Sequence, residues 1–488
     1  MSITEDLSPP STEIPTPPTE SAQRKRPGNG LYALAMRLHF YAGIFVAPFI
    51  LIAAVTGALY AIAPTLERIV SHDLLYVDGS GPEKPLSEQV SAAVRERPDL
   101  PLVAVAPAPE AGQTTRVIFG DTTLGEGERR AVFVNPYTAQ PVGESVVYGS
   151  SGALPLRTWI DHLHRDLHLG EPGRIYSEMA ASWLWIIALA GLVLWWRRVR
   201  GRRNRNSAKW LLTPDRSQGG RGKSLNWHGA VGIWVLPLLL IISVTGMTWS
   251  TYAGDNIAEL RKQLSWTTPS VSTKLPGSQG SVAHSGGEHA EHGAATATAP
   301  ADPAARIAQL TTVYAVARAN GVTQPVEISV PAKADQAFAV KERRMPGTYT
   351  VDAIAVNGLT GVVTDRLPYA QWSLMAKLTN WGIQFHMGLM FGLANQLLLL
   401  AAMIGLIVVI VLGYRMWWQR RPMRTGARLA LGRAPRRGAI RQSAWWLALP
   451  LVAAALVVGW FVPLVGLSLL GFVAVDVVIG IAGRLRSV

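Results

Sequence analysis

Long apolar runs alternate with polar stretches along this chain. Six runs lie at residues 38–63, 176–196, 228–250, 389–414, 444–462 and 464–483. Each run is close in length to the ~20 residues that a helix needs to cross a bilayer. The pattern predicts six membrane spans, of which the last two form a hairpin.

Two polar stretches between the runs have a different periodicity. The first contains a helical pattern at 86–97 and short runs rich in strand-forming residues at 102–106, 116–119 and 131–134. The second repeats this order, with a helix at 304–320 and strands at 326–330, 337–340 and 349–356. Each stretch therefore predicts a small α+β domain outside the membrane.

These patterns give the following predicted order: a disordered tail (1–30), span one (31–64), the first outside domain (65–158), a His-containing segment with span two (159–198), a basic loop (199–224), span three (225–252), the second outside domain (253–375), a second His-containing segment with span four (376–418), a second basic loop (419–442), and spans five (443–463) and six (464–483). Residues 270–303 are rich in Ser, Gly, Ala, Thr and His, which is typical of a flexible insertion.

The chain also repeats itself. Residues 39–57 match residues 228–246 without a gap at ten of nineteen positions, including a His, a Pro, a Thr and two Gly. A second register, shifted by 222 instead of 189, aligns the segments around His164 and His386. The two shifts differ by 33 residues, which is about the length of the insertion. We infer a parallel internal duplication, in which both copies have the same orientation in the membrane.

Composition and charge agree with a membrane protein. Of 488 residues, 49% are hydrophobic and 16% are charged, and the net charge is +14. The basic residues concentrate at 197–223 and 415–441, beside spans, so they indicate cytoplasmic loops by the positive-inside rule and do not indicate nucleic-acid binding. Both termini are then cytoplasmic. The predicted fold class is a mainly α membrane protein, with a four-helix transmembrane core, two α+β periplasmic domains and a C-terminal two-helix transmembrane hairpin.

Absence of cysteine narrows the possible chemistry. It excludes disulfides, iron–sulfur ligation, thiolate catalysis and c-type haem attachment. Any bound metal must use His or oxygen ligands.

The duplication sorts the histidines into pairs. His39 matches His228 at the cytoplasmic ends of their spans, and His164 matches His386 at the outer ends. About 30 Å of bilayer separates the members of one copy, so the pairs must form across copies. Two facing imidazoles without a third ligand suit axial ligation of a b-type haem better than a zinc site. We therefore predict two b-type haems, although a lone His at a span end is commonly just interfacial.

Other residues are weaker candidates. Gly43 and Gly232, one turn after their His, leave room for a flat macrocycle. His162 and His168 have no counterpart in the repeat. A carboxylate within a span, Asp476, is either functional or a contact within the helix hairpin. The remaining candidates are arginines that could pair with haem propionates or simply mark the interface, namely Arg37, Arg157, Arg165 and Arg174, and histidines of the insertion that could bind stray metal, namely His284, His289 and His292.

Several of these segments resemble the PepSY-associated transmembrane family over residues 33–418. The resemblance rests on Arg37-Leu38-His39, Asn226-Trp227-His228, Phe385-His386-Met387 and the run from Leu163 to Gly173. It implies PepSY-like outside domains on a four-helix core, and a role like that of the bacterial inner-membrane ferric-siderophore reductases in this family, which hold two haems. It also implies His39, His164, His228 and His386 as the ligands, and assigns nothing to the spans after Arg441.

Our leading hypothesis is an inner-membrane dihaem reductase that carries electrons to ferric iron, held as a ferric siderophore or other ferric chelate, between the two outside domains. No nucleotide or flavin motif is visible, so the donor is a quinol or a separate reductase. The catalytic residues are not identified by the sequence, and the four histidines are predicted only as haem ligands. Two alternatives remain open, a non-enzymatic regulatory or binding protein that uses its outside domains, and a transporter.

Overall fold

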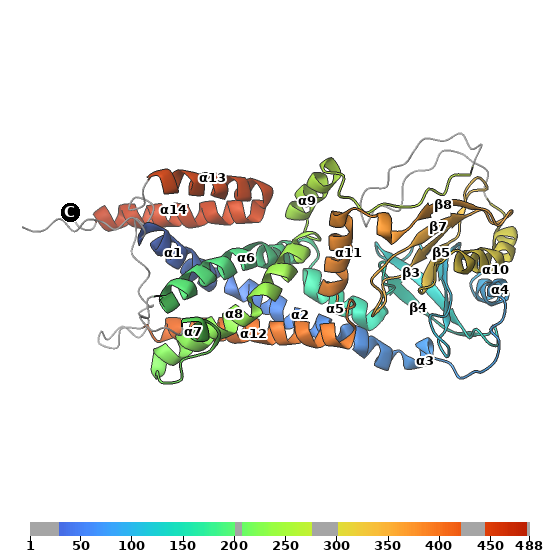
Figure 1. Cartoon of the computed structure of the whole chain (residues 1–488), viewed down its shortest axis with the longest axis horizontal. Helices are drawn as coiled ribbons and strands as arrows, with labels where there is room; N and C mark the ends of the chain where they lie inside the picture. The colour runs from blue at the N-terminus through green and yellow to red at the C-terminus, as the bar shows by residue number, and fades with distance from the viewer. Residues whose placement is uncertain (1–28, 201–206, 276–300, 421–444, 486–488) are drawn as a thin grey trace, which may run out of the picture.

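The computed structural model describes residues 29–200, 207–275, 301–420 and 445–485. Residues 1–28 of the predicted tail, most of the insertion with its three histidines, and residues 421–442 of the second basic loop lie outside the described residues. A helical bundle forms one end of the elongated molecule, and a β-sheet with two covering helices forms the other (Figure 1).

Four long apolar helices form the centre of the bundle: α2 (Ala47–Val70), α6 (Glu171–Arg200), α8 (Gly220–Met247) and α12 (Leu393–Trp418). α1 (Asn29–Phe45) precedes α2 and is separated from it only by Val46. With α14 (Pro463–Leu485), the described part of the chain has five helices long and apolar enough to cross a membrane. The fifth predicted span corresponds to α13 (Trp445–Phe461), a shorter apolar helix.

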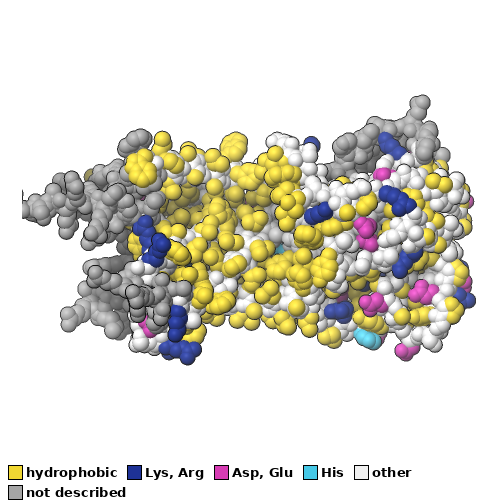
Figure 2. Space-filling model, in the orientation of Figure 1, with side chains coloured by type: hydrophobic (Ala, Val, Ile, Leu, Met, Phe, Trp, Pro, Cys, Tyr) yellow, Lys and Arg dark blue, Asp and Glu magenta, His cyan; other side chains and the backbone are white. Residues whose placement is uncertain are grey.

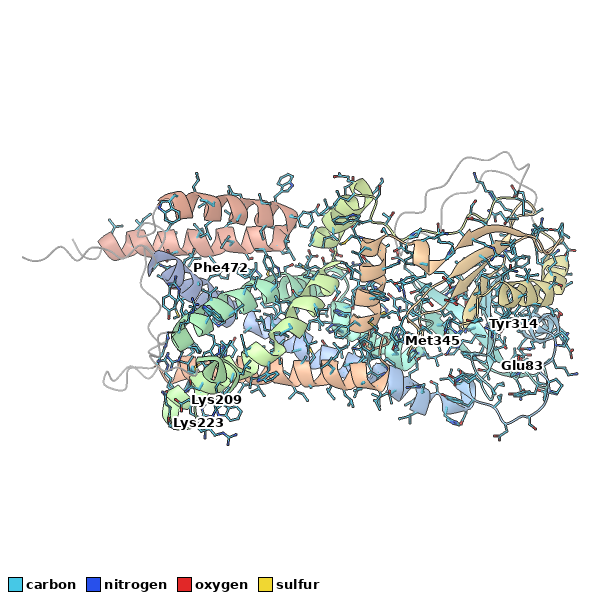
Figure 3. All side chains as sticks on the ribbon, in the orientation of Figure 1. Glu83, Lys209, Lys223, Tyr314, Met345 and Phe472 are labelled. Carbon is cyan, nitrogen blue, oxygen red and sulfur yellow. The ribbon has the colours of Figure 1, made fainter. Side chains whose placement is uncertain are left out.

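Small residues allow the bundle helices to approach closely, as is usual inside membranes. A Cβ atom added to Gly229 of α8 would lie 2.3 Å from the Trp195 ring of α6, and one added to Gly405 of α12 would lie 2.5 Å from Val235. On the face seen in Figure 2, hydrophobic side chains cover most of the bundle, whereas charged side chains of both signs are scattered over the end that holds the sheet. Lys209 and Lys223 lie at the bundle end remote from the sheet (Figure 3).

All eight strands join in one antiparallel sheet, in the order β4-β3-β2-β1-β5-β6-β7-β8. Their bounds are β1 (Leu102–Ala106), β2 (Thr115–Phe119), β3 (Glu128–Val134), β4 (Pro141–Tyr148), β5 (Val326–Ser329), β6 (Phe338–Glu342), β7 (Ala353–Val356) and β8 (Val363–Leu367). α4 (Leu86–Glu96) and α10 (Pro303–Ala319) pack on one face, where Val105, Phe119 and Ile328 are fully buried. Ile118, which points the other way, belongs to a second core under that face with Leu75 of α3 (His72–Leu75).

The two predicted outside domains are joined to each other in the structure. β1 pairs with β5 through Ala104 with Ser329 and Val105 with Ile328, so the two halves share one sheet and one core. This pairing removes two exposed strand edges. The edge strands β4 and β8 were not predicted, because most of their side chains are exposed or half-buried and carry no clear alternation.

Short helices connect the sheet to the bundle, and they carry His164 and His386. His164 and His386 were expected at the outer ends of spans, but they lie on α5 (Pro155–Asp166) and α11 (Leu374–His386), ahead of α6 and α12. Leu167 adopts φ 55° and ends α5, and Gly388 with φ 72° follows α11. A left-handed residue at this position ends a helix, so each His-containing segment turns before its span begins.

The C-terminal hairpin packs on the outside of this bundle. Arg37 Nη2 lies 2.7 Å from Asp476 Oδ1, and Trp183 Nε1 donates to Ser468 Oγ at 2.8 Å. Asn256, on α9 (Tyr252–Gln263), donates to the Phe461 carbonyl. Phe472 of α14 packs against Trp183 with ring centroids 5.8 Å apart, at the side of the bundle seen in Figure 3. Asp476 is therefore engaged in a contact between the hairpin and the core.

Candidate functional site

His39 of α1 and His228 of α8 form an inner pair, at the bundle end remote from the sheet. Their ring centroids are 6.0 Å apart and their planes are nearly perpendicular, at 84°. Two imidazoles that each bind one shared metal through a bond of about 2 Å have centroids roughly 6 Å apart. Among the described residues, no group of three or more His, Cys, Asp or Glu could hold a metal ion. The centroid distance of the inner pair is therefore compatible with two ligands to one metal.

Backbone carbonyls orient both rings of the inner pair. His39 Nδ1 donates to the Ile187 carbonyl of α6 at 2.9 Å, and His228 Nδ1 donates to the Val409 carbonyl of α12 at 2.9 Å. A carbonyl can only accept a hydrogen bond, so each Nδ1 carries the proton and each Nε2 keeps its lone pair. This is the arrangement that second-shell partners impose on metal-binding histidines.

Glycines make room for these rings against the helix backbones. A Cβ atom at Gly191, four residues after Ile187, would lie 2.9 Å from His39 Cε1. At Gly413, four residues after Val409, it would lie 3.7 Å from His228 Cε1. The absence of a side chain at Gly191 therefore lets the His39 ring reach the carbonyl.

His164 of α5 and His386 of α11 form an outer pair at the junction of bundle and sheet. Both line one cavity of about 680 Å³ together with Gly57 and Gly246. This volume lies within the range of about 300–1,000 Å³ that small-molecule and cofactor sites occupy. Bundle side chains such as Ile50 form its apolar floor.

Threonine hydroxyls orient the outer pair. His164 Nδ1 lies 2.9 Å from Thr56 Oγ1, and His386 Nδ1 lies 2.7 Å from Thr245 Oγ1. Each hydroxyl donates its single proton to a carbonyl one turn earlier, at Ile52 (2.9 Å) or Ile241 (2.8 Å). The threonine oxygen must then accept from the imidazole, so Nε2 again keeps its lone pair.

Thr56 and Thr245 were not predicted as site residues. A signal was present in the sequence, because both recur in the 189-residue register beside the repeated Gly57 and Gly246. A repeated threonine in an apolar span could equally satisfy only its own helix, which is the common structural reading. Its contact with a histidine on another helix is visible only in the folded chain.

The mouth of the outer cavity is polar and lies against the sheet. It is lined by residues 125–128 and 148–151, and by Arg165, Arg174 and Arg344. Arg165 Nη1 donates to Tyr148 Oη at 2.5 Å, and Arg344 Nε donates to Asn380 Oδ1 at 2.9 Å. Cationic side chains from both halves of the protein thus surround the opening.

Buried arginines fix the loop at this mouth. Arg116 of β2 donates to the Gly152 carbonyl at 2.9 Å, and Arg343 donates to the Ser151 carbonyl at 3.4 Å. Burial, together with the nearby Arg343, lowers the pKa of Arg116 to about 9. Arg157 of α5 donates to Ser151 Oγ at 3.1 Å and lies 3.7 Å from Glu67. Arginines from both halves of the sheet therefore hold the same loop, at residues 151–152.

The structure separates the four arginines named from the sequence. Arg165 and Arg174 line the outer cavity, Arg157 lies behind its wall with Glu67, and Arg37 lies at the other end of the bundle with Asp476. The unrepeated histidines also have other partners. His162 Nδ1 lies 3.2 Å from Asp166 Oδ2, and the His168 ring packs on Trp159 at 5.0 Å.

The two pairs are separated along the bundle. Thr245, which contacts His386, follows His228 by seventeen residues along one continuous helix, α8. At 1.5 Å per residue this is about 25 Å. The value is somewhat less than the sequence estimate, because the outer histidines reach back into the bundle from separate helices.

Comparison with known proteins identifies the family of this chain. A family model described as "PepSY-associated TM region" matches residues 36–420, which include both His pairs and both threonines but not the C-terminal hairpin. An uncharacterized protein of Pseudomonas aeruginosa is 34% identical over 93 residues, which cover 19% of this chain and 21% of that relative. The match thus spans about a fifth of the relative's length. Since the family model covers most of the chain, this multi-pass membrane protein belongs to the PepSY-associated transmembrane family.

Proposed function

We propose that this protein is a dihaem b-type reductase of the bacterial inner membrane. It would carry electrons from the cytoplasmic side to a ferric chelate, such as a ferric siderophore, on the outer side. The observation that carries the proposal is the hydrogen bonding of the four histidines. Each Nδ1 donates to an acceptor, so each Nε2 remains available as a ligand. Two such pairs at opposite ends of one bundle suit a transmembrane electron route.

The surroundings of both pairs are compatible with haem. His39 and His228 would hold one haem, and His164 and His386 the other. Outside its own helix, a Cβ atom added at Gly43 would meet nothing within 4 Å, and one at Gly232 would meet only Val409 at 4.0 Å, so other parts of the chain do not crowd these two positions. The outer cavity combines an apolar floor with arginines at its mouth, as a flat apolar ring with two carboxylates requires. When bound, haem would supply one-electron redox chemistry.

The residues of the chain have three tasks in this proposal. The hydrogen-bond acceptors hold each imidazole in one tautomer and orientation. The apolar helices exclude water from the route. The cavity mouth, with Arg165 and Arg344, offers a docking place for a ferric chelate beside the outer pair. Hard oxygen donors hold iron(III) more firmly than iron(II), so reduction there would weaken the chelate.

Gly191 tests whether the inner pair is a haem site. Gly191→Ala is expected to reduce inner haem occupancy by at least half, because the new Cβ would lie 2.9 Å from His39 Cε1. Alanine is intrinsically better than glycine in a helix, so backbone effects would not cause the loss. Haem per chain and the visible spectrum measure the result. Gly471→Ala is the matched control, because a Cβ there meets nothing within 4 Å; equal haem content in the two variants would contradict the assignment.

The visible spectrum of the purified protein tests the function itself. We expect two b-type haems per chain, with spectra typical of paired His ligands, and reoxidation of the reduced protein by a ferric chelate. A protein that binds no haem after expression with sufficient iron and haem precursor would refute the reductase. The regulatory and transport alternatives would then be tested by partner binding and by substrate flux.

A further inference from the structure

The two histidine pairs differ in the chemistry of their hydrogen-bond acceptors. Both inner imidazoles donate to backbone carbonyls, those of Ile187 and Val409. Both outer imidazoles donate to hydroxyls, those of Thr56 and Thr245. The difference occurs in both halves of the chain, so it follows the depth of the pair and not the copy to which a histidine belongs.

Acceptor strength affects the iron through the imidazole. A partner that accepts from Nδ1–H raises the basicity of Nε2. A more basic axial ligand favours the oxidised metal, and second-shell hydrogen bonding is one of the levers that set a haem potential. An amide carbonyl is a stronger acceptor than a neutral hydroxyl. Donation by each threonine to its own helix strengthens its oxygen as an acceptor by only about 10–30%.

Other influences do not separate the pairs as clearly. Both pairs have the same ligand type, and in both pairs the imidazoles contact the long helices of the bundle. The outer cavity is lined by Arg165, Arg174 and Arg344, but also by acids, namely Glu126, Glu128, Asp161 and Glu178. These opposite charges largely offset one another, whereas the acceptor difference acts directly on the ligands.

We propose that Thr56 and Thr245 are positioning residues whose hydroxyls, as weaker acceptors than the backbone carbonyls of the inner pair, lower the reduction potential of the outer site less than those carbonyls lower that of the inner site. The outer potential is then the higher of the two. This inference rests on the proposed dihaem function. One electron leaves the inner site and one electron arrives at the outer site, and no proton or bond changes. With the outer potential above the inner one, electron transfer from the inner site to the outer site is favourable.

Equilibrium redox titration of the haem-loaded full-length protein, followed in the visible spectrum, tests this proposal. The wild-type protein is expected to give two midpoint potentials. A His39→Ala variant that retains only the outer haem identifies the outer value, which should be the higher one. Thr56→Val removes an acceptor with little change of side-chain volume, so it should raise the outer potential. The rise should be up to about 59 mV, which corresponds to about a tenfold change in the equilibrium constant for one-electron transfer. The inner potential should not change.

Thr56→Ser is the matched control, because it keeps the hydroxyl and should leave both potentials within error. If Thr56→Val loses the outer haem, the order of the two wild-type potentials and the value for Thr245→Val decide the question. An inner potential above the outer one, or a Thr56→Val protein with two unchanged potentials, would overturn the inference while the dihaem function stands. A protein without haem would refute the proposed function instead.

Discussion

Replacement of His228 by alanine is expected to remove one of the two haem equivalents per chain and to leave the other. His228 shares the inner site with His39 alone, and the described residues offer no third ligand nearby. The outer pair lies about 25 Å away along α8 and has its own acceptors. Haem per chain by the pyridine haemochrome method measures the loss.

His162→Ala and His168→Ala are the matched controls for this experiment. Both residues lie within six positions of His164, yet His162 is engaged with Asp166 and His168 packs on Trp159. Each control should retain two haems. Full haem content in His228→Ala, or loss of a haem from His168→Ala together with retention in His164→Ala, would show that the ligands are assigned wrongly.

A membrane-impermeant ferric chelate is expected to reoxidise the reduced protein only from the face that carries the sheet. The outer pair opens to that face through the cavity mouth, whereas the inner pair lies at the opposite end of the bundle. Right-side-out and inside-out vesicles, each with reduced haem, distinguish the two faces. The measured quantity is the rate at which the reduced absorption band disappears after addition of the chelate.

The same vesicles test the need for both sites. His39→Ala should keep the outer haem, but reduction of that haem by the physiological donor should slow by orders of magnitude, because one relay in a gap of about 25 Å is missing. The matched variant is Gly471→Ala, whose new Cβ touches nothing. Normal turnover of His39→Ala, or equal reoxidation from both faces, would contradict a transmembrane electron route and favour a regulatory role.

Much of the secondary structure was encoded locally and could be predicted. Apolar runs of sufficient length correspond to α2, α6, α8, α12 and α14. Residues 86–97 and 304–320 predicted α4 and α10 within two residues at each end. The largely buried strands β1, β2, β3 and β7 were also predicted, whereas the edge strands β4 and β8, whose side chains are mostly exposed or half-buried, were not. A strand buried on both faces gives a short continuous apolar run in the sequence, which a half-exposed strand lacks.

The sequence by itself also determined which histidines belong together. Two repeat registers and the charge of the loops paired His39 with His228 and His164 with His386, and the folded chain places each pair at one depth. Register and depth are encoded by local composition, so no tertiary information was needed. Their role as haem ligands remains a prediction.

Only the tertiary structure decided what surrounds those histidines. The continuous sheet depends on pairing between β1 and β5, which are more than two hundred residues apart. The imidazoles reach the carbonyls of Ile187 and Val409 and the hydroxyls of Thr56 and Thr245 only when helices from different parts of the chain pack together. The ion pair between Arg37 and Asp476 likewise forms only because α14 packs beside α1. Periodicity records which face of an element is buried, but a contact between elements depends on their packing in three dimensions.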